Sequence, residues 1–267
     1  FFFQAEYGIR YFCLSRGLGD VYKRQNQMSA CGEIISDVRK IIVKNIEPGI
    51  STWELDKLAE EYTISKGFIP AFKGYQNFPS SICASINNEV VHGLPSKNRI
   101  LKQGDIIGVD FGVYDGTFYA DSAFTFPVGD VSENITKLLN VTKESLNLGI
   151  QKAQVGNKIY DISKAIQDHI EKNGFTVVRS YVGHGIGKDL HEEPHVPNFI
   201  LDNNDRSKSM KLKEGMVLAI EPMVNIGNFE VELSNDNWTV KTCDGSLSAH
   251  FEHTVALTKN GPKILTN

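Results

Sequence analysis

Residues 101–110 read LKQGDIIGVD, and residues 212–221 read LKEGMVLAIE. Each stretch carries an apolar run that predicts a buried strand, and each run ends in a carboxylate, Asp110 or Glu221. A helical pattern repeats as well, at a constant offset in residue number: Gly49, Leu55, Lys57, Gly67 and Phe68 correspond to Gly156, Ile162, Lys164, Gly174 and Phe175. The repeats predict an α+β fold with two pseudo-symmetric halves, each with helices and antiparallel strands, and a site between them. Fold duplication without function is the open alternative.

Two helices are predicted before the first strands. From Met28 the apolar stripe Ile34, Ile35, Val38, Ile41 and Ile42 predicts a helix, and Pro48-Gly49 predicts its end. Ser51 and Glu54 form a capping-box pattern that predicts the start of a second helix.

The segment 1–25 differs from the rest of the chain. It begins at Phe1 and lacks both helical and strand periodicity, and GLGDVYKRQ at 17–25 resembles translated adapter or vector sequence. It also lacks the continuous apolar block of a signal peptide. We therefore expect 1–25 to be a non-native or disordered leader that is poorly packed, and 26–267 to form a single domain.

Composition narrows the class of protein. The 267 residues contain 28 Lys and Arg against 32 Asp and Glu, a net charge of −4, which argues against a nucleic-acid partner. Four cysteines occur singly, so they predict neither a disulfide framework nor a thiolate zinc site. No apolar run approaches the ~18 residues of a membrane span. These features predict a cytoplasmic protein with no membrane partner.

Four carboxylates and one histidine occur in apolar contexts: Asp110, Asp121, Glu221, Glu252 and His184. Buried carboxylates cost several kcal/mol unless they are neutralised, and these segments contain no Lys or Arg. A pair of divalent metal ions would neutralise them, with Asp121 and Glu252 bridging both ions. One imidazole with four carboxylates suits Mn, Fe(II) or Co. For any single acid, a solvated residue at a strand end is the alternative.

One familiar metal motif is rejected. Residues 191–195 read HEEPH and match H-E-x-x-H, which binds zinc when it lies on a helix. Pro194 and the glycines of GHGIG at residues 183–187 instead predict a loop or a strand. We interpret the glycines as small residues that let His184 approach a crowded site.

From about Asn26 to the C-terminus, the sequence resembles type I methionine aminopeptidases, metallopeptidases with the pita-bread fold. The segments that carry the resemblance are SINNEVVHGLP at 85–95, Val109-Asp110, Ala120-Asp121-Ser122, GHGIG at 183–187, AIEPM at 219–223 and Glu252-His253-Thr254. The short spacing between His184 and Glu221 leaves no room for the long insertion of type II relatives. The resemblance therefore favours the short, bacterial-like form.

The resemblance implies a role for each candidate residue. Asp110, Asp121, His184, Glu221 and Glu252 would hold two divalent ions (Co, Mn, Fe(II) or Zn), and Glu221 would also act as general base. His191 would contact the scissile carbonyl, and His92 the substrate backbone. The methionine pocket would consist of Phe72, Tyr75, Phe78, Cys83, Leu190 and Trp238. The chain departs from many relatives at Leu190, where Phe is common, and at His250, where Gln is common.

The implied function is removal of the initiator methionine from nascent proteins, with a preference for a small second residue. The implied partners are nascent polypeptide N-termini, with the ribosome as a candidate place of encounter, and we expect a monomer. Two alternatives stay open: an Xaa-Pro peptidase of the same fold, and a catalytically inactive pita-bread module that only binds.

Overall fold

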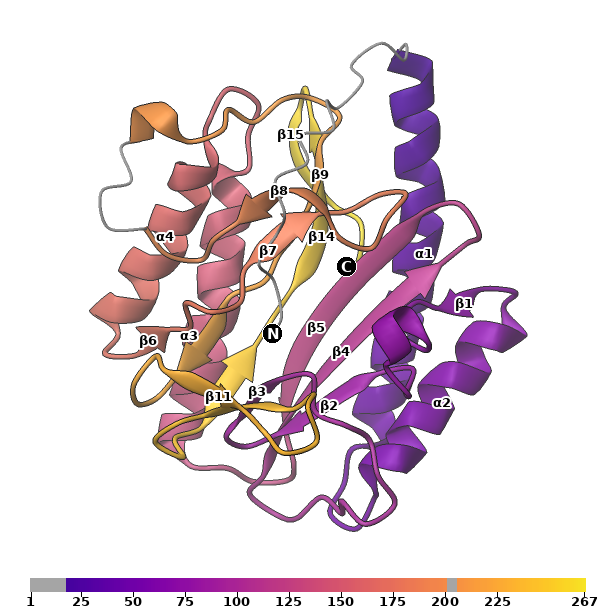
Figure 1. Cartoon of the computed structure of the whole chain (residues 1–267), viewed down its shortest axis with the longest axis vertical. Coiled ribbons are helices and arrows are strands. Elements are labelled where there is room, and N and C mark those ends of the chain that lie inside the picture. Colours follow the sequence, from indigo (N-terminus) through magenta and orange to yellow (C-terminus); the bar gives the residue numbers. More distant parts are fainter. Residues whose placement is uncertain (1–17, 201–205) are drawn as a thin grey trace.

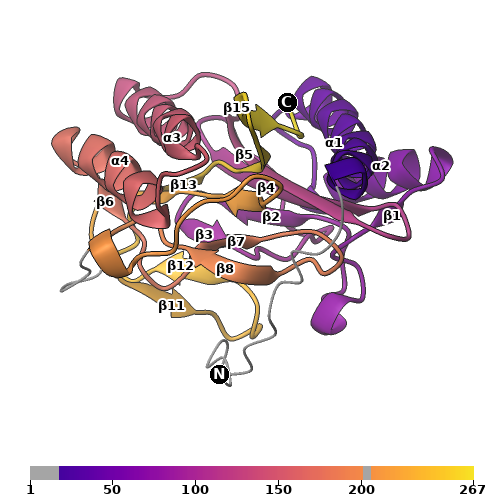
Figure 2. The ribbon, with the colours of Figure 1, turned by 90° about the horizontal axis from the view of Figure 1, so that it is seen from above.

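Two pairs of helices flank the strands on opposite sides of the molecule (Figures 1 and 2). The computed structural model describes residues 18–200 and 206–267. One pair is α1 (Leu18–Asn45) with α2 (Thr52–Ser65), and the other is α3 (Glu133–Lys152) with α4 (Ile159–Lys172). Both α2 and α4 have 14 residues, and the offset that relates the two sequence patterns also relates their first and last residues. The sequence repeat is therefore also a repeat of structure.

Helices α2 and α4 begin with a similar hydrogen bond from the backbone to a carboxylate. The backbone N–H of Ser51 donates to Glu54 Oε2 at 2.9 Å, and the backbone N–H of Glu54 donates to Ser51 Oγ at 3.2 Å, which confirms the predicted capping box. At the start of α4, the backbone N–H of Lys158 donates to Asp161 Oδ2 at 2.9 Å. The carboxylates thus satisfy N–H groups that have no partner within the helix.

The first helix is longer than the sequence predicts. It begins at Leu18 instead of Met28, so the expectation that the chain up to position 25 is poorly packed is wrong for the part that the structure describes. Arg24 Nη2 donates to the carbonyl oxygen of Gly215 at 2.6 Å, and Gln25 is buried. Neither anchor has a sequence signature, because the Arg24 contact depends on a residue far along the chain and the burial of Gln25 depends on the folded structure. Residues 1–17 lie outside the described residues, and the foreign origin of the leader stays a prediction.

All strand pairs of the described residues are antiparallel, as predicted. The larger sheet of the first half contains β1 (Ile69–Pro70), β4 (Ile106–Tyr114) and β2 (Cys83–Ile86), with β5 (Tyr119–Pro127) paired to β4. The larger sheet of the second half has the order β15 (Gly261–Ile264), β14 (His253–Thr258), β9 (Val217–Ile220), β7 (Gly183–Gly185) and β8 (Glu192–Val196). The two repeated stretches thus become β4 and β9.

Two small sheets and two short 3-10 helices complete the described elements. One sheet has the order β13 (Ser248–His250), β10 (Met223–Asn225) and β6 (Thr176–Val177), and the other β11 (Val231–Leu233), β12 (Val240–Thr242) and β3 (Glu89–Val91). The 3-10 helices are η1 (Tyr75–Asn77) and η2 (Arg206–Lys208).

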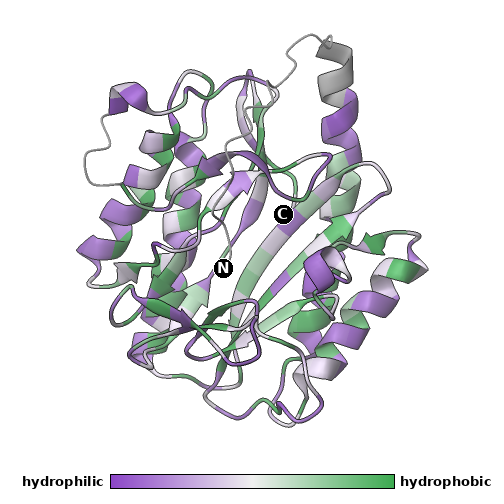
Figure 3. Ribbon diagram, in the orientation of Figure 1, coloured by the Kyte–Doolittle hydropathy of each residue, from purple (hydrophilic) through white to green (hydrophobic). Residues whose placement is uncertain are grey.

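Each half has its own hydrophobic core between its helices and its sheet. In the first half Ile35 and Leu55 pack with Ile107. In the second half Leu138, Ile162, Leu218 and Val255 share a core. Apolar residues accordingly gather on the strands and on the helix faces toward them (Figure 3). No described helix is long and apolar enough to cross a membrane.

Candidate metal centre

Two carboxylates of the centre come from the hairpin of β4 and β5. Asp110 lies opposite Ala123, and Asp121 lies opposite Gly112. Because residues two apart on a strand point to the same face, Asp110 and Asp121 project from one face as diagonal neighbours. These two acids therefore lie beside each other on one hairpin.

The second half contributes an imidazole and two further carboxylates. His184 lies on β7 opposite Ala219 of β9. Glu221 follows the last residue of β9, and Glu252 precedes the first residue of β14. Since β9 and β14 are antiparallel and pair Ile220 with His253, the two glutamates leave the sheet at the same end.

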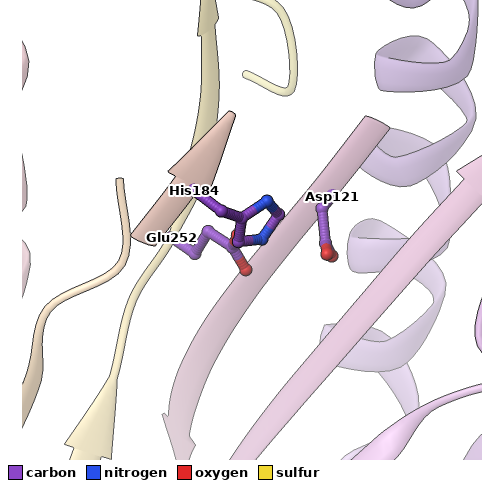
Figure 4. Close-up of side chains that lie close together, drawn as sticks. All are labelled: Asp121, His184 and Glu252. Carbon is purple, nitrogen blue, oxygen red and sulfur yellow. The ribbon is translucent and has the colours of Figure 1, made fainter. Parts of the chain in front are cut away.

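Side chains from both halves meet at one point. One ligand atom each of Asp121, His184 and Glu252 lies within 4.8 Å of the others, and Figure 4 shows the three side chains pointing toward one another. His184 Nε2 lies 3.5 Å from Glu221 Oε1. Two atoms that are each about 2.1 Å from a tetrahedral ion lie about 3.4 Å apart. The 3.5 Å between His184 and Glu221 is close to this spacing, and the atoms of Asp121, His184 and Glu252 form a group that could hold a metal ion.

The carboxylates are held in an environment that disfavours their charge. Burial raises the pKa of Asp121 to about 7. Burial, together with repulsion from the neighbouring carboxylates, raises the pKa of Asp110, Glu221 and Glu252 well above their usual values. Burial also lowers the pKa of His184 to about 3, so its imidazole is neutral and able to bind a metal.

Three oxygens of this group have no hydrogen-bond partner although they are buried: Asp110 Oδ1, Asp121 Oδ1 and Glu252 Oε1. An unsatisfied buried polar group costs about 1–3 kcal/mol. Divalent cations would satisfy these oxygens and offset the repulsion between the carboxylates. The donor set, four carboxylates and one imidazole, fits a hard or borderline ion such as Mn, Fe(II) or Co. The residues present therefore fit a divalent metal centre.

Hydrogen bonds between β5 and the segment leading into β14 join the two halves beside the centre. Thr254 Oγ1 donates to the carbonyl oxygen of Asp121 at 2.8 Å, and the backbone N–H of Asp121 lies 2.9 Å from the same Oγ1. Ser122 Oγ donates to the carbonyl oxygen of Glu252 at 2.6 Å, and the backbone N–H of Glu252 donates to the carbonyl oxygen of Ala123 at 2.8 Å. The backbones of Asp121 and Glu252 are thus held against each other.

Sequence reasoning missed these supporting residues. Ser122 and Thr254 lie within the motifs quoted above, but their partners are far away in the chain. Asn198 was missed as well, and its Nδ2 donates to the carbonyl oxygen of Glu221 at 3.0 Å. Local pattern gives no signal for such contacts, because a Ser, Thr or Asn in a strand or loop has no periodic signature.

Both predicted active-site histidines border the centre. The His191 ring lies 4.3 Å from the His184 ring between centroids, and its Nδ1 is 2.9 Å from the Tyr75 hydroxyl. His92 has φ 60° and packs edge-on against Tyr181 at 5.6 Å. Burial lowers the pKa of both His92 and His191 to about 4. Both imidazoles are therefore neutral at pH 7.

All six residues predicted for the methionine pocket belong to one hydrophobic cluster: Phe72, Tyr75, Phe78, Cys83, Leu190 and Trp238. Tyr75 and Trp238 are partly buried, and the other four are buried. Cys83 lies on β2 directly opposite Asp110, and the Phe78 and Trp238 rings meet edge to face at 5.0 Å. The cluster is thus adjacent to the carboxylates.

The structure supports the rejection of the H-E-x-x-H motif. Residues 192–196 form strand β8, and the side chain of His195 is half exposed. The interpretation of the glycines is confirmed as well. A Cβ atom at Gly183 would lie 2.3 Å from the carbonyl oxygen of Ala219, and one at Gly185 would lie 2.3 Å from that of Glu193. Only glycine lets β7, which carries His184, fit between its neighbours.

His250, the departure noted above, faces the same centre. Its Nε2 is buried without a hydrogen-bond partner and lies 3.8 Å from Glu221 Oε2. Leu190, the other departure, is buried within the pocket cluster. Both departures therefore lie at the site.

Comparison with known proteins agrees with this geometry. The model of metallopeptidase family M24 matches residues 26–259. The chain belongs to metallopeptidase family M24. Within the M24 family it is 51% identical over 239 residues to methionine aminopeptidase 1 of Bacillus subtilis, covering 90% of this chain and 94% of that protein. It is 50% identical over 239 residues to the methionine aminopeptidase of Clostridium acetobutylicum, again over 90% of this chain and 94% of the relative.

Solved structures of M24 proteins share the fold. The methionine aminopeptidase of Rickettsia prowazekii has a TM-score of 0.87 and 40% identity, covering 92% of this chain and 98% of that chain. The prolidase of Pyrococcus horikoshii has a TM-score of 0.72 at 20% identity, and the match covers 92% of this chain and 62% of the prolidase chain. The predicted pita-bread fold is thus confirmed, and the prolidase supports the fold alone.

Proposed function

We propose that the chain is a methionine aminopeptidase that removes the initiator methionine from nascent proteins. The observation that carries the proposal is the meeting of Asp121, His184 and Glu252 from both halves, next to an apolar cluster with Tyr75 and Trp238 at its partly exposed side. The high identity to methionine aminopeptidases over nearly their whole length supports it.

In this proposal five side chains hold two divalent ions: Asp110, Asp121, His184, Glu221 and Glu252. Asp121 and Glu252, which come from opposite halves and whose backbones are held together by hydrogen bonds, would be the two ligands shared by both ions. The chemistry that bound divalent ions supply is activation of water near neutral pH and polarisation of the scissile carbonyl. The nature of the ions among Co, Mn, Fe(II) and Zn is left to the experiment below.

The remaining roles belong to the chain's own groups. Glu221 accepts the proton of the attacking water as general base. His191 donates a hydrogen bond to the carbonyl oxygen as it becomes tetrahedral, and His92 binds the substrate backbone. The apolar cluster holds the methionine side chain, because aromatic rings and sulfur contact a flexible thioether favourably. A small second residue fits the closed-in site.

The experiment compares Met-Ala-Ser with Ala-Pro peptides on metal-stripped protein, with Mn²⁺, Co²⁺, Fe²⁺ or Zn²⁺ added singly. We expect hydrolysis of Met-Ala-Ser that depends on added metal, and little hydrolysis of Ala-Pro. Preference for Ala-Pro would instead identify an Xaa-Pro peptidase. Absence of hydrolysis with every metal, in protein that binds the metals, would identify a binding module.

A further inference from the structure

Tyr75 connects the apolar pocket to the proposed catalytic histidine. Its ring packs against the pocket cluster, while its hydroxyl lies 2.9 Å from His191 Nδ1. The two rings lie 5.5 Å apart at an interplanar angle of 39°. One side chain thus contacts both the place where the substrate side chain is recognised and the group proposed to act on the carbonyl.

The environment of the Tyr75 hydroxyl keeps its proton on the phenol oxygen at neutral pH. Burial raises the pKa of Tyr75, and a hydrogen bond from the Gln76 side chain opposes that rise. A hydrogen bond that lowers a phenol pKa is one donated to the phenol oxygen. At 2.9 Å the Tyr75 hydroxyl is within hydrogen-bond distance of His191 Nδ1, and a phenol O–H can donate its proton to an unprotonated imidazole nitrogen.

The backbone at this point is strained. Gln76 has φ 48° and ψ 30°, and Asn77 has φ 70°. Residues other than glycine rarely occupy this left-handed region, and such strain gathers at functional sites. The strained turn lies directly after Tyr75.

We propose that Tyr75 is a positioning residue that fixes His191 in the tautomer with its proton on Nε2. A neutral imidazole has one donor and one acceptor nitrogen. When Nδ1 accepts from Tyr75, Nε2 carries the N–H. This inference rests on the proposed function, because that function gives the Nε2 proton its use: a hydrogen bond to the substrate carbonyl oxygen.

The arrangement couples specificity to rate. A methionine side chain that packs on the Tyr75 ring also restricts the group that orients His191. Correct placement of the substrate side chain therefore acts on kcat as well as on binding. Tyr75→Phe separates the two effects, because it keeps the ring in the pocket and removes only the hydroxyl.

The tautomer is measured directly by long-range ¹H–¹⁵N NMR of the His191 ring in Zn²⁺-loaded protein. We expect the wild-type protein to carry the proton on Nε2, and Tyr75→Phe to show a mixture of both tautomers. A wild-type proton on Nδ1, or an unchanged tautomer in Tyr75→Phe, would overturn the inference. This readout needs no turnover, so a failure to hydrolyse Met-Ala-Ser counts against the proposed function alone.

Kinetics test the consequence on Met-Ala-Ser. Loss of one neutral hydrogen bond predicts a fall in kcat of about 3- to 10-fold in Tyr75→Phe, with KM within about twofold of wild type. In a His191→Ala background the Tyr75→Phe change should have no further effect, because it acts through His191.

The matched control is Tyr119→Phe, which removes a hydroxyl from another tyrosine packed against the same cluster, stacked on Tyr114 at 4.2 Å. We expect it to leave kcat unchanged. An equal loss in Tyr119→Phe, or a Tyr75→Phe loss that persists in the His191→Ala background, would show a general packing effect and contradict the proposal.

Discussion

His191 illustrates how a single side chain at the edge of the centre is expected to act. It donates to an oxygen whose charge develops only in the transition state, so its effect should fall on rate more than on binding. Loss of one such donor typically costs about 10²- to 10³-fold in kcat. We expect His191→Ala to lower kcat and kcat/KM by similar factors, with KM and bound metal close to wild type. Kinetics and bound metal should be measured on the same preparation. Loss of metal in His191→Ala would instead identify His191 as a ligand, and an unchanged kcat would show that it has no role in catalysis.

The candidate ligands could be predicted from the sequence, whereas most of the residues that hold them in place could not. Asp110 and Glu221 stand out because each ends an apolar run, which is where a carboxylate is costly unless it has a use. Asn198 has no comparable signal. Its importance comes from a contact with Glu221, which cannot be inferred from residue type alone.

At the scale of elements, the contact between β5 and β14 is the structural basis of the shared centre. Thr254 is fully buried, and its hydroxyl both donates to and accepts from the backbone of Asp121. Thr254→Val would leave that buried N–H and carbonyl unsatisfied, which should lower the free energy of unfolding by about 1–3 kcal/mol and weaken metal binding. Thr254→Ser keeps the hydroxyl and serves as the control. Denaturant unfolding and metal titration of both variants check this, and equal behaviour of the two would refute the role of the hydroxyl.

The first helix gives a prediction about truncation. Removal of residues 1–25 takes away the Arg24 hydrogen bond and the buried Gln25, so we expect a loss of about 1–2 kcal/mol with the fold retained. Removal through residue 45 also takes away Ile35, Val38 and Ile42 from the core, and this chain should not fold. Thermal unfolding followed by circular dichroism distinguishes the cases. Unfolding of the shorter truncation, or folding of the longer one, would contradict the account.

Helices and strands could be predicted where apolar residues recur at a regular spacing in the sequence. The α2 and α4 repeat, the capping box of Ser51 and the strands β4 and β9 all follow from spacing between near neighbours in the sequence. The extension of α1 to Leu18 could not be predicted, because Arg24 contacts a distant backbone group and Gln25 becomes buried only in the folded protein. The contact between β5 and β14 could not be predicted either, because the residue pattern of a strand does not show which other sheet it meets.

For the whole molecule, the gathered carboxylates make stability depend on pH and on metal. In metal-stripped protein the folded state keeps protons on these carboxyls at pH values where the unfolded chain has lost them, since burial raises the pKa of Asp121 to about 7. Stability should therefore fall as pH rises. Buried histidines act in the opposite direction: burial lowers the pKa of His184 to about 3, so their contribution is complete above about pH 6.5.

Between about pH 6.5 and 8 we thus expect the metal-stripped protein to lose stability of order 1 kcal/mol, and Mn²⁺ to abolish the loss. Thermal unfolding at several pH values, with chelator or with Mn²⁺, measures both curves. A metal-stripped protein whose stability stays flat or rises over this range would show that the carboxyls are not held near one another as described.

The most direct test of the central claim, a dinuclear centre shared by the two halves, is the number of metal ions retained per chain after dialysis. We expect two in the wild-type protein. Asp121→Ala should retain none, because Asp121 is proposed to bridge both ions, whereas Asp110→Ala, which lacks a terminal ligand, should retain about one. Metal analysis beside a folding check by circular dichroism gives the answer. Two ions retained by folded Asp121→Ala would contradict the bridging centre.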